Sequence, residues 1–228
     1  RMANSGSCGR VSLSDDGTLL CFAAFQDGSS ATADETLNLN RAAAGLNYDH
    51  VLSIGLSYTS TSLGGSQARS CIFLGDNTSA SGDWIVNDKG GLYEGSGMNV
   101  FTEPNLNPYN NVVVRTFGGI PYVLTQKVTG PSIPGFYSLG FDPDTGLYDV
   151  TPFTPGVPID GNAADFYMVS TNGGNTYDTL YILTSLSTNG IIKKFSLVSG
   201  SWTANGSITN QIGGSGSDSL FATTNGNG

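Results

Sequence analysis

Charged side chains are scarce in this chain, and basic ones are the scarcest. Lys and Arg together number 9 against 18 Asp and Glu, which gives a formal net charge of −9 over 228 residues. Nucleic-acid binding needs a basic stripe that neutralises phosphates, and Lys193-Lys194 is the only adjacent basic pair. We therefore expect no nucleic-acid partner, and the same balance disfavours anionic membranes.

Long apolar runs and helical periodicity are also missing. No apolar run approaches the ~18 residues that a membrane-spanning helix needs, so we expect no membrane insertion. No apolar signal segment follows Arg1-Met2-Ala3-Asn4. Apolar residues do not recur with a 3.6-residue period over more than a few residues, so little helix is expected.

Cysteine and histidine are too few for common metal or catalytic arrangements. The three cysteines, Cys8, Cys21 and Cys71, form no Cys-x-x-Cys pair and no Cys/His cluster, so structural zinc is not expected. Their odd number leaves at least one thiol unpaired or joined to another chain. Two interpretations stay open. Cys21 and Cys71 are buried small residues, or one disulfide forms, either Cys21 with Cys71 or Cys8 with one of them.

Candidate catalytic residues are few as well. A Ser-His-Asp triad would have to use His50, the only histidine, and no Gly-x-Ser-x-Gly nucleophile elbow is present. Among the few glutamates, Glu94 and Glu103 lie near the end of one unit, where we expect surface roles. An enzyme is left open but is the less favoured class.

Glycine is abundant, at 32 residues, and it separates short apolar runs. The clearest examples are Asn111 to Val128, through Phe117-Gly118-Gly119, and Asp165 to Leu183, through Asn172-Gly173-Gly174. Four strands per unit, with units repeating about every 44 to 57 residues, are typical of β-propeller blades. We predict an all-β propeller of about four blades plus an extra strand, incomplete or completed by other segments; the alternative is a β-sandwich.

The expected single domain covers residues 1–228, with blades at about 9–57, 67–102, 111–151 and 164–208 and a partial blade at 217–223. In the first blade, Asp15-Asp16-Gly17 predicts a hairpin turn. Residues 26–40 are predicted to be an irregular loop with a short helical turn at Asp34-Glu35-Thr36. Residues 41–46 and 50–57 are predicted to form the next strand pair. Ser219–Thr223 is predicted to be a lone strand.

Several stretches resemble secreted, functionally uncharacterised β-propeller proteins of microbes. They are Gly9 to Gly17, Ala68-Arg69-Ser70, Asp178 to Ile182, Gly190 to Leu197 and Ser201 to Gly206. The resemblance, carried by their order, implies a secreted propeller. It also implies that further blades flank this region, so that the chain is an internal portion of a longer protein. It supplies no catalytic motif to carry over.

The sequence gives only weak signals for metal, glycosylation and sugar-binding sites. Calcium is the one candidate cofactor, with Asp142, Asp144 and Asp160 as possible ligands in acidic turns. Asn77 and Asn205 begin glycosylation sequons. Four aromatic residues near strand ends are expected either to pack between blades or to stack on sugars: Tyr93, Tyr137, Tyr148 and Trp202.

An open propeller exposes sheet edges and an apolar blade face. We therefore expect partners that complete it, either other polypeptide segments or copies of the chain, in a ring or a filament. The expected function is that of a non-catalytic extracellular module, structural or adhesive. The alternative is a propeller that binds glycans or hydrolyses glycans or esters.

Overall fold

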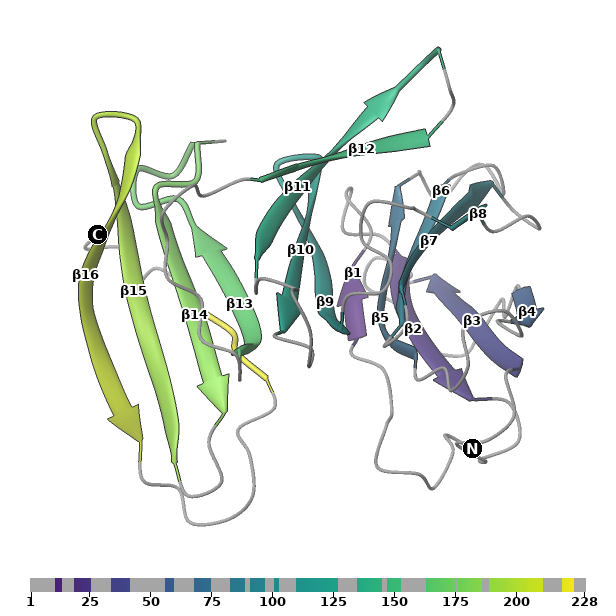
Figure 1. The fold of residues 1–228 in the computed structure, drawn as a ribbon, viewed down its shortest axis with the longest axis horizontal. Helices are drawn as coiled ribbons and strands as arrows, with labels where there is room; N and C mark the ends of the chain where they lie inside the picture. Colours follow the sequence, from purple (N-terminus) through teal and green to yellow (C-terminus); the bar gives the residue numbers. More distant parts are fainter. Residues whose placement is uncertain are drawn as a thin grey trace.

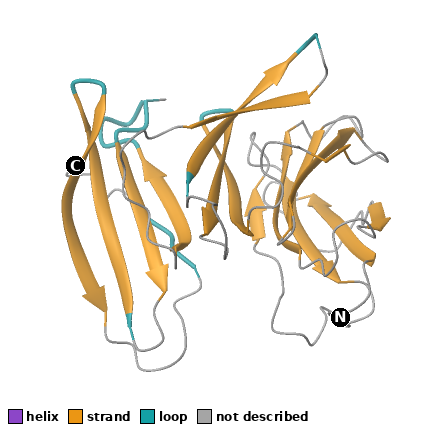
Figure 2. Cartoon of the chain, in the orientation of Figure 1, coloured by secondary structure: helices purple, strands orange, loops and turns teal. Residues whose placement is uncertain are grey.

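The computed structural model describes the strands of the chain and part of their connections. These are residues 11–13, 19–25, 34–41, 56–59, 68–74, 83–88, 91–96, 101–102, 110–126, 135–144, 147–152, 163–174, 176–185, 189–210 and 219–223. All the regular secondary structure assigned within these ranges is β-strand, as Figure 2 shows. The prediction of an all-β protein is confirmed.

The described strands form four antiparallel sheets of four strands each. Sheet 1 contains β1 (Val11–Leu13), β2 (Leu19–Phe25), β3 (Asp34–Arg41) and β4 (Leu56–Thr59). Sheet 2 contains β5 (Ala68–Leu74), β6 (Asp83–Asp88), β7 (Gly91–Ser96) and β8 (Phe101–Thr102). Sheet 3 contains β9 (Asn110–Phe117), β10 (Ile120–Gln126), β11 (Phe136–Asp142) and β12 (Leu147–Pro152). Sheet 4 contains β13 (Ala163–Val169), β14 (Thr179–Ser185), β15 (Gly190–Val198) and β16 (Ser201–Asn210).

Sheet 1 contains an error in strand assignment. The hairpin of β1 and β2 is confirmed, with Val11 opposite Phe22. The helical turn predicted at Asp34-Glu35-Thr36 is wrong, because β3 covers these residues and pairs along the whole of β2. Leu37 and Leu39 alternate with polar neighbours, which is the two-residue period of a strand. The partner of β3 is β4 rather than a strand at 41–46; residues 42–55, including His50, lie outside the described residues.

Each sheet is a meander, in which spatial order follows chain order. The first strand of each later sheet packs on the first two strands of the sheet before it. β5 contacts β1 and β2, β9 contacts β5 and β6, and β13 contacts β9 and β10. Figure 1 shows the result, with sheets 1 and 2 on the right, sheet 3 in the centre and sheet 4 on the left. The four described sheets form an open row and do not close into a ring.

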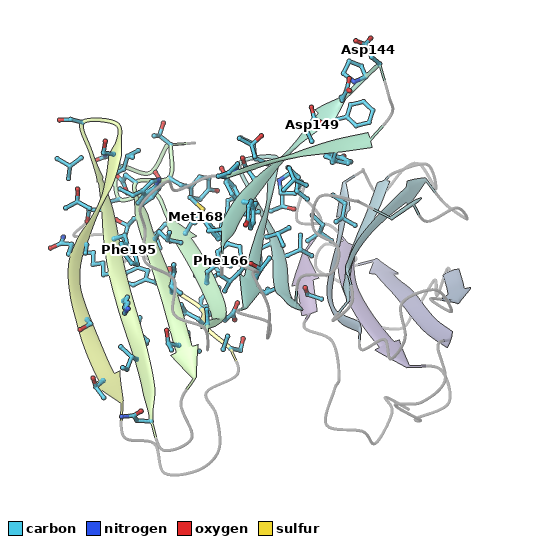
Figure 3. The ribbon with its side chains drawn as sticks, in the orientation of Figure 1. Asp144, Asp149, Phe166, Met168 and Phe195 are labelled. Carbon is cyan, nitrogen blue, oxygen red and sulfur yellow. The ribbon has the colours of Figure 1, made fainter. Side chains whose placement is uncertain are left out.

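Among the side chains that the structure describes, the core forms two layers, one on each face of sheet 3. The layer toward sheet 2 contains Ile72, Ile85, Val114, Val123, Leu139 and Tyr148. The layer toward sheet 4 contains Val113, Phe117, Tyr122, Leu124, Phe136, Ala163, Phe166, Met168, Leu180, Ile182 and Phe195. Figure 3 labels three members of the second layer, Phe166, Met168 and Phe195. Within the described part of the chain, no helix is long and apolar enough to cross a membrane.

Candidate functional site

The first strands of sheets 2, 3 and 4 share an irregularity at the same place. In β5, β9 and β13 the pairing to the next strand shifts by one residue, so that Arg69, Val112 and Ala164 are extra residues without a partner. Such β-bulges bend a strand and redirect the side chains beside it. The residues that follow the bulges are Ser70, Val113 and Asp165.

Two of these residues bind the backbone of another segment. The buried Ser70 Oγ accepts a hydrogen bond of 2.8 Å from the Val114 N–H of β9, which joins sheet 2 to sheet 3. Asp165 Oδ2 accepts one of 2.7 Å from the Leu220 N–H. In both cases the residue after the bulge of a first strand accepts a hydrogen bond from the backbone of a later segment. Val113 has no polar side chain, and sheets 3 and 4 are joined differently.

An ion pair joins sheet 3 to sheet 4. Arg115 Nε lies 3.2 Å from Asp165 Oδ1, and Arg115 Nη2 lies 2.9 Å from Asp165 Oδ2. The Asp165 side chain is 0% exposed and that of Arg115 is 15% exposed. Asp165 Oδ1 also accepts the Phe166 N–H at 2.8 Å. A buried carboxylate is tolerated only when it is paired and hydrogen-bonded, and Asp165 meets both conditions.

The segment 219–223 is held at this ion pair. Besides the Leu220 N–H bond to Asp165, the Leu220 carbonyl accepts a bond of 3.4 Å from Arg115 Nη2. The Phe221 ring meets Tyr167 edge-on at 5.0 Å, and the Arg115 guanidinium lies over Tyr167 at 5.6 Å. The prediction of a strand here is wrong, because the segment is not assigned as one. Its backbone instead forms hydrogen bonds with the side chains of Arg115 and Asp165.

The segment lies on the face of sheet 4 that points away from sheet 3, which we call the outer face. Phe166 and Met168 belong to the core between sheets 3 and 4, so the alternating Asp165 and Tyr167 belong to the other face. Cross-strand pairing extends this face over four strands. Its residues are Asp165, Tyr167, Tyr181, Leu183, Ile192, Lys194 and Ile208. Because β13 is an edge strand, Arg115 reaches past that edge to join this face.

A cleft opens between sheets 3 and 4, at the end where the β9–β10 and β15–β16 turns lie. Its volume is about 490 Å³. The lining residues are Phe117, Gly118, Ile120, Tyr122, Met168, Thr176, Tyr177, Leu197, Gly200, Ser201 and Trp202. Rings and hydroxyls dominate this lining, and none of these described residues is charged.

Two tight turns shape the rim of the cleft. Gly118 and Gly119 have φ of 60° and 78°, and Ser199 and Gly200 have φ of 49° and 79°. Positive φ at both central residues is the geometry of a type I′ hairpin turn, which matches the twist of its strands. Both turns therefore hold their strand ends at fixed positions beside the cleft.

The aromatic rings of the cleft are fixed by contact with one another. Phe117 contacts Tyr122 at 6.2 Å and Tyr177 at 5.4 Å, and it contacts Phe166 at 5.9 Å in the core. Tyr122 is stacked on Phe136 at 5.9 Å. Burial raises the pKa of Tyr122, and the nearby Tyr177 raises it further. The Tyr122 hydroxyl therefore stays protonated at neutral pH.

Asp178 organises the connection from β13 to β14, which includes Thr176 and Tyr177. Its carboxylate accepts hydrogen bonds from the Thr171 N–H at 3.0 Å, from the Thr171 hydroxyl and from Asn172 Nδ2 at 3.2 Å. The Thr171 hydroxyl bond is the main cause that lowers the pKa of Asp178. One side chain thus closes the loop that forms part of the cleft wall.

The candidate metal ligands are not brought together. Asp142 Oδ1 accepts the Asp144 N–H at 2.9 Å, which is the hydrogen bond of a local turn. Both residues lie on the projecting β11–β12 hairpin, with Asp144 at its tip in Figure 3. Asp160 lies outside the described residues. No group of three or more His, Cys, Asp and Glu forms among the residues that the structure describes. Calcium binding stays a prediction.

The other predicted sites are only partly covered by the structure. Asn205 is exposed on β16, where Asn205-Gly206 forms a bulge opposite Lys194 and Asn205 Nδ2 donates to Ser196 Oγ at 3.0 Å. Asn77 and Cys8 lie outside the described residues. Cys21 is on β2 and Cys71 on β5, two strands in contact, but their side chains are not described. Glycosylation and cysteine pairing stay predictions.

The four predicted aromatic residues have different surroundings. Tyr148 is buried in the core between sheets 2 and 3, and Tyr137 packs against that core. Trp202 is partly buried and lines the cleft. The side chain of Tyr93, like that of Glu94, is not described, and Glu103 lies outside the described residues. Packing between sheets therefore accounts for Tyr137 and Tyr148, whereas Trp202 packs partly against the core and partly lines the cleft.

Sequence reasoning did not identify the ion pair of Arg115 and Asp165. A signal was present, because each is the single charged residue in a strand that is otherwise polar or apolar, and their charges are opposite. Compared with models of known protein families and with curated proteins, the chain shows no match. Function must therefore be argued from the junction of sheets 3 and 4.

Proposed function

We propose that this chain is a non-catalytic β-propeller module that works by assembling with other polypeptide through the outer face of sheet 4. The observation that carries the proposal is the hydrogen bond from Leu220 to the Asp165 carboxylate. It repeats the bond from Val114 to Ser70, which joins the first strands of sheets 2 and 3. The segment 219–223 thus takes the place that β9 takes beside β5, which is the place of a further first strand.

The exposed apolar side chains support this assignment. Phe221 is 75% exposed and Ile208 is 68% exposed. Phe221 contacts Tyr167 and Ile208 pairs with Ile192, so both belong to the outer face. Burying such a side chain contributes about 1.5–3 kcal/mol, and contiguous apolar surface marks interaction sites. A further four-stranded sheet, seated as sheet 4 sits on sheet 3, would cover both.

The added sheet belongs either to another segment of the same protein or to a second copy of the chain. In both cases the radial row of sheets continues, and a row that does not close becomes a filament. The scarcity of charge and the abundance of hydroxyl and amide side chains suit a secreted, extracellular setting. Secretion and glycosylation at Asn205 are parts of the same proposal.

The protein isolated from its source tests the proposal. We expect a native particle heavier than the 23.6 kDa of this chain. Amine-reactive cross-linking from Lys194, on the outer face, should identify what is seated there. A cross-link from Lys194 to any residue of another molecule of this chain, Lys194 included, indicates a second copy. A cross-link to a peptide outside residues 1–228 indicates a further segment. A particle of 23.6 kDa with no such link would overturn the proposal.

A pair of variants locates the contact. If the added sheet comes from a second copy, Phe221→Asp with Ile208→Asp should lower the native mass, because two charges replace apolar contacts at the interface. If it is a further segment of the same protein, the variant should keep its mass but lose the cross-link from Lys194. Phe141→Asp is the matched control, since Phe141 is also exposed, at 53%, but lies on the β11–β12 hairpin. An equal loss of mass in both variants would show that the outer face is not the interface.

A further inference from the structure

We propose that the cleft between sheets 3 and 4 binds a neutral saccharide. The proposal does not depend on assembly through the outer face. It begins with the shape of the cleft, whose volume of about 490 Å³ lies within the range of roughly 300–1,000 Å³ of small-molecule sites. The cleft opens at the end of the sheets where three hairpin connections meet, so a ligand reaches it from solvent.

The lining has the two properties that a sugar requires. Sugar rings offer apolar C–H faces, which pack on aromatic rings, and hydroxyls, which exchange hydrogen bonds with polar side chains. Trp202 and Tyr177 supply partly buried rings, and Ser201, Thr176 and Tyr177 supply hydroxyls. Met168 and Leu197 complete the apolar part of the lining.

The charge of the site selects against ionised ligands. No Lys, Arg, Asp or Glu belongs to the described lining. Placing an anionic sugar there would desolvate its charge without a cationic partner, which is unfavourable. The net charge of −9 adds long-range repulsion. A neutral saccharide avoids both costs.

The site is also preorganised. Phe117 holds Tyr122 and Tyr177 by ring contacts, the two type I′ turns fix Gly118 and Gly200, and Asp178 closes the loop before Tyr177. A rigid site loses little conformational entropy when the ligand binds. The described lining contains no carboxylate that could act as an acid or nucleophile, so the proposal is restricted to binding.

The chain contains two tryptophans, so binding in the cleft can be followed by tryptophan fluorescence once one of them is removed. Trp84→Phe removes the tryptophan on β6, in sheet 2, and leaves Trp202 as the only indole. The probes are a printed array of neutral glycans and, in solution, cellobiose, maltose and N,N′-diacetylchitobiose. Glucuronic acid and glucose 6-phosphate are the charged comparisons. We expect at least one neutral glycan to bind on the array and to change Trp202 fluorescence in a saturable way.

Calorimetry on three variants ties binding to the cleft. Trp202→Ala should weaken binding at least about tenfold, as expected for a tryptophan that anchors a ligand. Tyr177→Phe should weaken it about threefold, through loss of one hydroxyl. Phe141→Ala, on the distant hairpin, should leave it unchanged. The proposal is wrong if no neutral glycan binds, if charged sugars bind equally well, or if Trp202→Ala binds as tightly as the natural chain.

Discussion

Sheet 3 has a neighbour on each face, and its two junctions are built differently. Toward sheet 2 the buried side chains are mostly aliphatic, and the bridging hydrogen bond, from Val114 to Ser70, is neutral. Toward sheet 4 the layer is rich in aromatic rings, the bridge is the ion pair of Arg115 and Asp165, and a cleft opens beside it. Among the described side chains of the two junctions, those of the second are the ones suited to meet something outside the sheets.

The chemistry of the side chains explains the difference. Aliphatic side chains interdigitate and fill an interior to crystal-like density. Aromatic rings meet edge to face at fixed angles, as Phe117 meets Tyr177, and their polar tips need contact with water or a partner. The junction toward sheet 2 is therefore filled by packing, whereas the junction toward sheet 4 combines packing with the recognition that we propose.

The largest difference between the two junctions is expected when the cation of the ion pair is removed. Arg115→Met leaves the fully buried Asp165 carboxylate without its positive partner. We expect the free energy of unfolding in urea to fall by about 3–5 kcal/mol, the usual cost of an uncompensated buried charge.

The double variant Arg115→Met with Asp165→Asn is the control, because it removes the carboxylate charge as well. It should recover part of the loss. If Arg115→Met lowers the free energy of unfolding by less than about 1 kcal/mol, the pair is no stronger than a surface ion pair. The ionic bridge would then stabilise its junction no more than the neutral bridge does.

A smaller effect is expected at the neutral junction. Ser70→Ala removes the acceptor of the Val114 N–H and leaves a buried donor unpaired. The expected loss in the free energy of unfolding is roughly 1–3 kcal/mol. Ser70→Thr keeps the hydroxyl and serves as the control. A loss as large as that of Arg115→Met would contradict the distinction between a neutral and an ionic bridge.

The smallest effect concerns pH and the loop beside the cleft. Because hydrogen bonds lower the pKa of Asp178 in the folded state, its contribution to stability is complete above its ordinary pKa. That contribution is lost as the pH falls from about 4 through the lowered folded pKa. Asp178→Asn should therefore flatten the acid side of the stability–pH curve slightly, as measured by urea unfolding between about pH 2 and pH 7. An unchanged acid limb would show that Asp178 is not linked to folding.

Local pattern was enough to predict most strands. The apolar run from Asn111 to Val128, divided by Gly118-Gly119, predicts two strands, and the structure has β9 at Asn110–Phe117 and β10 at Ile120–Gln126. The polar β3 was missed because Asn38 and Asn40, which alternate with its leucines, also suit a loop.

The junction of sheets 3 and 4 was beyond the reach of local pattern. Arg115 and Asp165 are 50 residues apart in the sequence, and their pairing depends on the bulge at Ala164 and on which strand edges meet. Leu220 is a further 55 residues from Asp165. Sequence periodicity gives the face of a strand on which a residue lies, but not the partner that a neighbouring sheet brings to it.

The bulge at Asn205-Gly206 has a consequence for how copies of the molecule can meet. β16 is ten residues long, ends sheet 4 and contains no charged residue, which makes it a template for sideways addition of a foreign strand. Gly206, with φ of 105°, interrupts the regular ladder midway and adds local twist. A foreign strand could match only half of such an edge, so amyloid-like lateral growth is discouraged and contact is directed to the broad side of the sheet.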